Sequence, residues 1–205
     1  MNNSTLNNGD AGYWHAFLEG DKEAYAGIYR QYFSLLYEYG IRLCRDKEVV
    51  KDCIQDLFIK LWVNREHLQQ ATAIKPYLLI ALKSTLLNKL DQMHRMAARA
   101  GRVLEMSAFD LHYTTAEESL IHDDEEAMRR QQIRAALDNL THRQKECIFL
   151  RFYIGLEYAE IADTMQISVK ASYKIIGRAI TVMRKYFKEI MVSDMLLFMM
   201  LLTAI

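Results

Sequence analysis

The sequence predicts an all-α protein in which two small helical domains are joined by an acidic linker, and the C-terminal domain contains a helix-turn-helix. Three observations lead to this prediction. The 205 residues include only eight glycines and one proline, and turn-rich β proteins usually need more of both. Apolar residues recur every three or four positions along most of the chain, which is the spacing of one helix face. Basic residues are concentrated on both sides of an acidic stretch.

The total charge is balanced, with 26 basic and 26 acidic residues, but the charge is unevenly divided along the chain. Residues 67–104 hold six basic residues and one acid, and residues 105–128 hold eight acids and no lysine or arginine. Residues 129–205 hold twelve basic and seven acidic residues. Two basic bodies therefore flank an acidic connector, a distribution that suits nucleic-acid binding although the total charge does not.

The first predicted domain covers residues 13–96 and contains three helices. Asp21 and Asp46 are placed to cap the first two, because an aspartate there accepts hydrogen bonds from free N–H groups of the first turn. The predicted inner face of the first helix is Tyr25, Ile28, Tyr29, Tyr32, Leu36, Tyr39 and Leu43. That of the second helix is Val49, Val50, Cys53, Ile54, Leu57, Phe58, Leu61 and Trp62.

The third helix follows a loop predicted over residues 64–74. Pro76 suits its first turn, because the missing N–H of a proline would have no intrahelical partner there. We expect the inward side chains to be Tyr77, Leu79, Leu82, Leu86 and Leu90. We expect the outward side chains to include Lys83, Lys89 and Arg95.

Residues 97–126 form the predicted acidic linker. Its apolar side chains Phe109, Leu111 and Tyr113 indicate that it docks on a folded part of the chain. Residues 191–205 form an apolar tail, whose last eleven residues would reach about 16 Å as a helix, half the width of a bilayer. We expect this tail to pack against a groove of the same chain or of a partner, since an exposed apolar patch usually marks an interaction surface.

The second predicted domain covers residues 127–190. One apolar stripe precedes a break at Thr141, and its members are Ile133, Ala136, Leu137 and Leu140. A second stripe follows the break, and its members are Cys147, Ile148, Leu150 and Phe152. Gly155 marks a further turn.

Residues 157–185, EYAEIADTMQISVKASYKIIGRAITVMRK, fit a helix-turn-helix. Ala162 is small where two helices cross closely, Ile167 fills the turn, and Ser168 is placed to cap the second helix. The first helix buries one face formed by Tyr158, Ile161, Ala162 and Met165. The second helix has a core face formed by Ser172, either Ile175 or Ile176, and Ala179.

The outer face of this second helix presents Lys170, Ala171, Lys174 and Arg178. Residues 164–188 hold six basic residues and no acid. A recognition helix places its first turns against base edges in the major groove, with flanking cations on phosphates. The alternative is an ordinary helical hairpin with a solvated basic face. The pattern E-I-A-x-x-M-x-I-S before an acid-free basic helix favours DNA binding.

Two segments resemble the extracytoplasmic-function (ECF) sigma factors of bacterial RNA polymerase. Residues 140–152, LTHRQKECIFLRF, are similar to the family run Leu-Pro-x-x-x-R-x-x-F/I-x-L-R that precedes its helix-turn-helix. Residues 50–62, VKDCIQDLFIKLW, are similar to the family's A-E-D-I-x-Q-E-x-F-x-x-x-W. Tyr77-Leu78 and Lys83-Ser84 fall where that family has Y-L followed by Arg-Asn. The likeness covers residues 14–95 and 128–188.

The resemblance implies roles for three sets of residues. Asp52, Gln55 and Asp56 match the positions that dock on the clamp helices of the largest polymerase subunit; a solvated polar face is the alternative. Residues that match the minus-ten reader are Lys83, Ser84, Lys89 and Arg95. Residues that match the minus-thirty-five reader are Lys170, Ala171, Lys174 and Ile175, with Arg178 on phosphate.

The chain departs from the family at three of these positions. Ala171 stands where relatives often carry Thr, which leaves a methyl group able to touch thymine. Ser172 replaces a usual core Val, and Ser84 replaces a usual Asn. These departures bear on the promoter sequence that is read. The acidic linker either threads toward the polymerase active centre, as in relatives, or is a spacer.

No feature of the sequence indicates catalysis, a cofactor or a metal. The six histidines show neither HxxxH nor HExxH spacing, and there is no glycine-rich phosphate loop. Cys44, Cys53 and Cys147 form no CxxC pair and read as buried thiols of a reducing cytosol. The N-terminus does not read as a secretion signal, and no run approaches the roughly 20 apolar residues of a membrane span. We therefore expect a cytoplasmic protein that is not an enzyme.

The sequence thus favours an alternative sigma factor that binds core RNA polymerase and promoter DNA and directs promoter-specific initiation. The family likeness further implies an anti-sigma factor as partner. The alternative is a stand-alone helix-turn-helix regulator with an N-terminal sensing or dimerisation domain. A helical scaffold that does not bind DNA is the third possibility.

Overall fold

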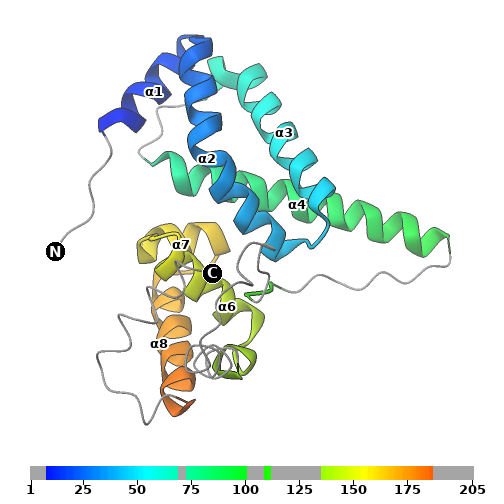
Figure 1. The fold of residues 1–205 in the computed structure, drawn as a ribbon, viewed down its shortest axis with the longest axis vertical. Helices are drawn as coiled ribbons and strands as arrows, with labels where there is room; N and C mark the ends of the chain where they lie inside the picture. The colour runs from blue at the N-terminus through cyan, green and yellow to red at the C-terminus, as the bar shows by residue number, and fades with distance from the viewer. Residues whose placement is uncertain (1–7, 69–72, 101–108, 112–134, 187–205) are drawn as a thin grey trace, which may run out of the picture. The chain divides into compact units, whose positions relative to one another are not determined.

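The computed structural model describes residues 8–68, 73–100, 109–111 and 135–186, and every regular element in these ranges is helical (Figure 1). The chain divides into two compact units, residues 1–107 and residues 108–205, called unit 1 and unit 2 below. The predicted all-α class with two helical bodies is confirmed. Most of the predicted linker and all of the apolar tail, residues 191–205, lie outside the described residues.

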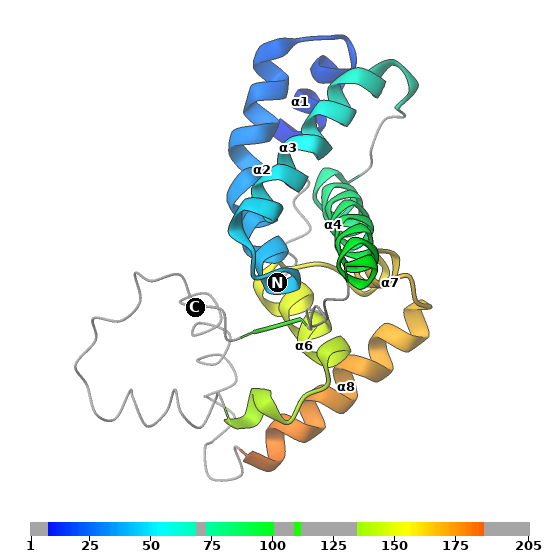
Figure 2. The same cartoon turned by 90° about the vertical axis from the view of Figure 1, so that its right-hand side faces the viewer.

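Unit 1 is built from four α-helices. They are α1 (Asn8–Leu18), α2 (Lys22–Leu43), α3 (Lys47–Asn64) and α4 (Ile74–Arg99), with a short 3₁₀ turn η1 (Arg65–His67) after α3. Helices α2, α3 and α4 all pack against one another, and α4 crosses the α2–α3 pair (Figures 1 and 2). Helix α4 begins at Ile74, so Pro76 lies in its first turn as predicted.

Helix α1 was not predicted from the sequence, because its apolar residues do not form a clear stripe. Aromatic contacts hold it to the unit. Trp14 and Phe17 are almost fully buried. The Trp14 ring lies 5.6 Å from that of Tyr77 at the start of α4, and the Phe17 ring stacks 5.8 Å from that of Tyr25 on α2. Burial of two large aromatic side chains compensates for the weak helical pattern.

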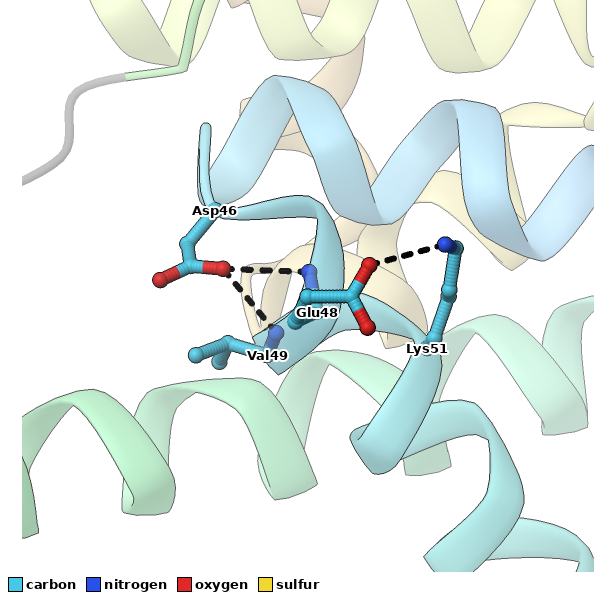
Figure 3. Close-up of polar contacts among 4 residues, drawn as sticks. All are labelled: Asp46, Glu48, Val49 and Lys51. Atoms are coloured by element: carbon cyan, nitrogen blue, oxygen red, sulfur yellow. Dashed lines mark hydrogen bonds and ion pairs between the residues drawn. The ribbon is translucent and has the colours of Figure 1, made fainter.

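Two aspartates cap the helices of unit 1, as predicted. The Asp21 carboxylate accepts hydrogen bonds from the backbone N–H groups of Glu23 and Ala24, at 2.8 and 3.2 Å. The Asp46 carboxylate accepts from those of Glu48 and Val49, at 3.0 and 3.2 Å (Figure 3). These bonds satisfy donors that have no partner within the helix. Both helices therefore begin at the point where an aspartate accepts hydrogen bonds from the free N–H groups of the first turn.

The core of unit 1 contains most of the side chains predicted to point inward. On α3 the buried side chains are Val50, Cys53, Ile54, Leu57, Phe58 and Leu61. Val49 and Trp62 are half-buried, and Tyr29 of α2 is 38 % exposed with its ring edge-on to Phe58. Gly40 lets α2 approach α3 closely, because a Cβ there would lie only 2.7 Å from Cγ1 of Val50.

Unit 2 contains α6 (His142–Ile148), a π-helical turn η3 (Phe149–Tyr153), α7 (Tyr158–Met165) and α8 (Val169–Tyr186). Helices α6 and α7 both pack on α8. Thr141 and Gln144 form a reciprocal capping box at the start of α6. Gly155 has a φ of +79°, a conformation that glycine adopts without strain, and this confirms the predicted turn.

A π-helical turn continues α6 directly. The backbone N–H of Ile154 bonds to the carbonyl of Phe149 at 3.0 Å, a spacing of five residues instead of four. Phe149, the first residue of this turn, is buried, while Phe152, predicted to point inward, is half-buried. Phe109 and Leu111 of the predicted linker are also buried, as expected, with the Phe109 ring 5.7 Å from that of Phe149. Tyr113 lies outside the described residues.

We expect Asp46→Ala to lower the free energy of unfolding by about 1 kcal/mol, because two N–H groups at the start of α3 lose their acceptor. Asp46→Asn should change it much less, since an asparagine side chain also caps a helix well. Chemical denaturation of both variants measures the difference. Asp52→Ala, on the exposed side of the same helix, is the control. Equal stability of the alanine variant and the unchanged protein would contradict a capping role for Asp46.

Candidate functional site

The helix-turn-helix of unit 2 is formed by α7 and α8. Gln166 ends α7 in the left-handed conformation, with a φ of 53°. The N–H of Ile167 then bonds to the carbonyl of Ala162 at 2.9 Å. The Ser168 hydroxyl accepts a hydrogen bond from the N–H of Ala171 at 3.2 Å, which confirms the predicted cap of α8. A three-residue turn, 166–168, therefore sets the crossing of the two helices.

The buried contact between α7 and α8 follows the predicted pattern closely. Ile161, Ala162 and Met165 of α7 are buried, and Tyr158 is half-buried. The buried residues of α8 are Ser172, Ile176, Ala179 and Met183. The sequence left open whether Ile175 or Ile176 belongs to the core, and the structure selects Ile176. Ile175 is half-buried at the edge of the helix.

Ser172, which stands where relatives usually have valine, makes a polar link between the two helices. Its side chain is completely buried. Its hydroxyl lies 3.0 Å from the carbonyl oxygen of Tyr158 on α7 and 2.7 Å from that of Val169. A buried hydroxyl needs such a partner, because an unsatisfied one costs roughly 1–3 kcal/mol. The serine therefore ties the start of α7 to the first turn of α8.

The outer face of α8 gathers three of the five residues predicted to read DNA. Lys170, Lys174 and Arg178 are exposed, and at about 100° per residue they lie within roughly 80° of one another around the helix. Ala171 and Ile175 lie along one edge of this face and are half-buried. The structure therefore presents a cationic face, and the apolar residues Ala171 and Ile175 lie at its border.

Two residues of α8 that the sequence analysis did not single out shape the same face. Tyr173 lies on the opposite edge from Ala171, is 55 % exposed, and stacks on Tyr158 of α7. Gly177 lies in the middle of the helix, and a Cβ there would meet nothing within 4 Å. The available signals were an aromatic residue among lysines and a glycine inside a helical pattern.

The predicted polymerase-binding residues form one exposed face of α3. Asp52, Gln55 and Asp56 are all exposed, opposite the buried side of the helix. Ile59 and Val63 continue this face at helical spacing and are 51 % and 67 % exposed. The resemblance had indicated only the three polar residues of this face, and the helical spacing of Ile59 and Val63 from Asp52 and Asp56 was the signal for the other two. The face combines acidic, amide and apolar groups.

The four residues predicted to read the minus-ten element do not share one face of α4. Ser84 and Arg95 are exposed and lie only about 20° apart around the helix, whereas Lys83 is half-buried about 100° away. Lys89 was predicted to point outward, and this is wrong. It follows Leu82 by two helical turns, so it lies on the core side and is half-buried.

The loop predicted over residues 64–74 begins with ordered structure. Asn64 ends α3 and residues 65–67 form η1, while residues 69–72 lie outside the described residues. The Arg65 guanidinium lies 4.8 Å from the centre of the Trp62 ring. An aromatic ring therefore lies just before the loop, at the end of α3.

The buried cysteines are not reactive groups. Cys44, Cys53 and Cys147 are free thiols. Burial raises the pKa of Cys53 to about 11, and the nearby charge of Lys89 opposes this only in part. Within the described ranges, no three His, Cys, Asp or Glu side chains are grouped so that they could hold a metal ion. None of the helices described has the length and apolar character that crossing a bilayer requires.

Comparison with known proteins identifies the class to which this chain belongs. The family model "Sigma-70 region 2" matches residues 28–95, which lie in unit 1. The model "Sigma-70, region 4" matches residues 130–182 and includes the helix-turn-helix. Together the two models cover more than half of the chain. The chain is therefore a sigma-70-type transcription initiation factor.

Curated relatives narrow the class. The ECF RNA polymerase sigma factor SigK of Mycolicibacterium vanbaalenii is 27% identical over 146 residues, which are 71% of this chain and 72% of that protein. The ECF RNA polymerase sigma factor SigX of Bacillus subtilis is 24% identical over 170 residues, 82% of this chain and 85% of that protein. The chain belongs to the ECF sigma factors, the alternative sigma subunits that direct RNA polymerase to particular promoters. This selects the predicted function over a stand-alone regulator.

Solved structures share the fold. The sigma factor RpoE of Bartonella quintana, in complex with the anti-sigma factor NepR, has a TM-score of 0.59 at 18% identity. The likeness covers 81% of this chain and 98% of that one. CnrH, in complex with the cytosolic domain of CnrY, has a TM-score of 0.56 at 16% identity and covers 89% of this chain and 99% of its own.

We expect Gly177→Ala to raise the free energy of unfolding by up to about 1 kcal/mol, because alanine favours a helix interior and the added methyl group meets open space. Gly40→Ala is the opposite case. Its methyl group would collide with Val50, so it should lower the free energy by about 1–3 kcal/mol. Thermal unfolding of both variants tests the pair, and a destabilised Gly177→Ala would show that the outer face of α8 is covered within the chain.

Proposed function

We propose that this sigma factor divides its work between the two helical bodies. Residues 13–96 bind core RNA polymerase and the minus-ten element, and residues 127–190 read the minus-thirty-five element. Residues 97–126 connect them, and the protein acts in the cytosol, beside the polymerase. The observation that carries this division is the separation of exposed faces, an acidic and apolar face on α3 and a cationic face on α8.

The face of α3 is suited to a protein partner. Asp52 and Asp56 supply negative charge, and Gln55 between them can donate and accept hydrogen bonds. Ile59 and Val63 add exposed apolar area to the surface. Contact of such area with water is unfavourable, so a patch of this kind usually marks a binding surface. Charge pairs give register and speed of association, while apolar contacts supply free energy of binding. A basic coiled coil of the polymerase would complement this combination.

The face of α8 is suited to duplex DNA. Lys170 lies in the first turn, Lys174 in the second and Arg178 in the third, so the three cations follow the helix along a groove. In the part of α8 that the structure describes, residues 169–186, no acidic residue interrupts this charge. Contacts between such cations and phosphates place the helix on DNA but carry no sequence information by themselves.

The minus-ten role rests on a smaller set of residues. Ser84 and Arg95 form the exposed part of the proposed surface, and Lys83 borders it. The Arg95 side chain already donates a hydrogen bond to the carbonyl of Asp91 at 3.2 Å, which holds it along the helix. Lys89 is assigned a supporting role, since its half-buried position limits its contact with a DNA strand.

Regulation by an anti-sigma factor is part of the proposal. Its support is the family itself and the anti-sigma factor NepR bound to the Bartonella quintana protein of the same fold. Isolation of the tagged protein from its own cells, with identification of a bound protein that blocks transcription by the holoenzyme, tests this part. A polypeptide that never copurifies with such an inhibitor would count against it.

Asp56→Lys should weaken binding to core polymerase about tenfold or more, because it places a positive charge in the centre of the α3 face. Fluorescence titration of the labelled sigma factor with core enzyme measures this. Glu19→Lys, an equal change of charge at an exposed turn of the same unit, is the matched control. Mapping of transcript starts with the reconstituted holoenzyme tests the function as a whole. Unaltered binding of Asp56→Lys would remove the α3 face from the interface.

Each of Lys170→Ala, Lys174→Ala and Arg178→Ala should reduce the salt dependence of promoter binding by the holoenzyme. A lysine or arginine on a phosphate releases about one counterion, so the slope of log affinity against log salt should fall by about one per variant. Filter binding at several salt concentrations gives the slope. Lys22→Ala, at the start of α2 and far from α8 in the sequence, should leave the slope unchanged. Slopes equal to that of the unchanged protein would exclude phosphate contacts by α8.

A further inference from the structure

Tyr173 is a large uncharged side chain on the cationic helix of the helix-turn-helix. It is the fifth residue of α8 and lies within the first two turns, between Lys170 and Lys174 in sequence. More than half of its surface, 55 %, is exposed. The first turns of a recognition helix are the part that meets base edges in the major groove. Tyr173 therefore lies where a side chain can reach DNA.

The exposed Tyr173 ring is nevertheless held in place. Its centroid lies 3.8 Å from that of Tyr158, and the two ring planes differ by only 15°. One face of the Tyr173 ring is therefore covered by α7, and the remaining surface is open. A ring fixed in this way gives up little conformational freedom when it binds a partner.

Tyr158 is in turn held from two sides. The Arg151 guanidinium lies 4.8 Å from the centre of the Tyr158 ring. Arg151 itself donates a hydrogen bond to the carbonyl of Leu156 at 2.7 Å and pairs with the Glu157 carboxylate at 3.2 Å. The buried Ser172 hydroxyl lies 3.0 Å from the Tyr158 carbonyl oxygen. The stacked side chains of Arg151, Tyr158 and Tyr173 thus connect η3, α7 and α8.

We propose that Tyr173 reads a base pair of the upstream promoter element and that Tyr158 and Arg151 are positioning residues that hold it. This inference rests on the proposed function of α8. Base edges are recognised by hydrogen bonds and by apolar contact with the thymine methyl group, and a tyrosine offers both a hydroxyl and a ring edge. The three cations of the outer face already suit the phosphates. Tyr173 thus takes the discriminating contact that the sequence had assigned to Ala171, which is half-buried.

Selection of promoters from a DNA library tests the proposal. Holoenzyme is reconstituted from the full chain and core RNA polymerase and transcribes a library randomised over the upstream element, and the transcribed templates are sequenced. Tyr173→Ala should reduce the preference at one or two adjacent positions about five- to tenfold, as for the loss of one base contact. Tyr173→Phe, which retains the ring stack, should reduce the preference at the same positions to a smaller extent. Preferences at all other positions should remain.

The positioning residues have a readout of their own. Tyr158→Phe keeps an aromatic ring under Tyr173 and should keep the promoter profile. Tyr158→Ala should lose preference at the same positions as Tyr173→Ala, with thermal unfolding measured in parallel. Tyr153→Phe removes the hydroxyl of a different stacked tyrosine, whose ring lies 4.7 Å from that of Phe149, and should leave the profile unchanged. Loss of preference at other positions in Tyr158→Ala would overturn the positioning role.

The outcomes separate this inference from the proposed function. If holoenzyme with the unchanged chain selects no upstream sequence, the proposed function of α8 fails, and the inference fails with it. If the unchanged chain selects a sequence and Tyr173→Ala selects the same one with equal strength, only the inference is overturned. The same holds if Tyr173→Ala weakens transcription from every template uniformly, which is the behaviour of a phosphate contact.

Discussion

One constraint determines the surfaces of this protein: each helix buries one side in a small core, and only the opposite side remains for partners. On α3, burial of Cys53 and Leu57 requires Asp52 and Asp56 to face outward. On α8, burial of Ile176 leaves Lys174 exposed in the same way. Because a helix turns by about 100° per residue, a shift of the core face by one position would move the whole binding surface.

Polar contacts then decide how neighbouring helices are placed. In unit 2 the left-handed Gln166 and the capping Ser168 define the turn, and the buried Ser172 hydroxyl joins α8 to the first residue of α7. A valine at position 172 has no hydroxyl and would leave the Tyr158 carbonyl without this partner. The departure from the family pattern is therefore a structural link between the helices.

The candidate surfaces differ in how completely they are assembled. The face of α3 is continuous, since Gln55 and Ile59 follow one another at the spacing of one helical turn. The proposed minus-ten surface of α4 is divided, because Lys89 lies on the core side two turns after Leu82. A lysine there can extend its long side chain past the end of the core, which explains why an inward position tolerates a charge.

The sequence alone determined the helical class, the aspartate caps, the helix-turn-helix and most of the buried stripes, because each depends on neighbours within one or two turns. It also indicated the family, through motifs that are contiguous in the chain. Tertiary structure decided what depends on contacts between helices. Helix α1 exists because Trp14 and Phe17 find aromatic partners elsewhere, and Tyr173 is held by a ring fifteen residues earlier in the chain. Periodicity along a single helix cannot show which distant ring covers a side chain, because that depends on how the helices cross.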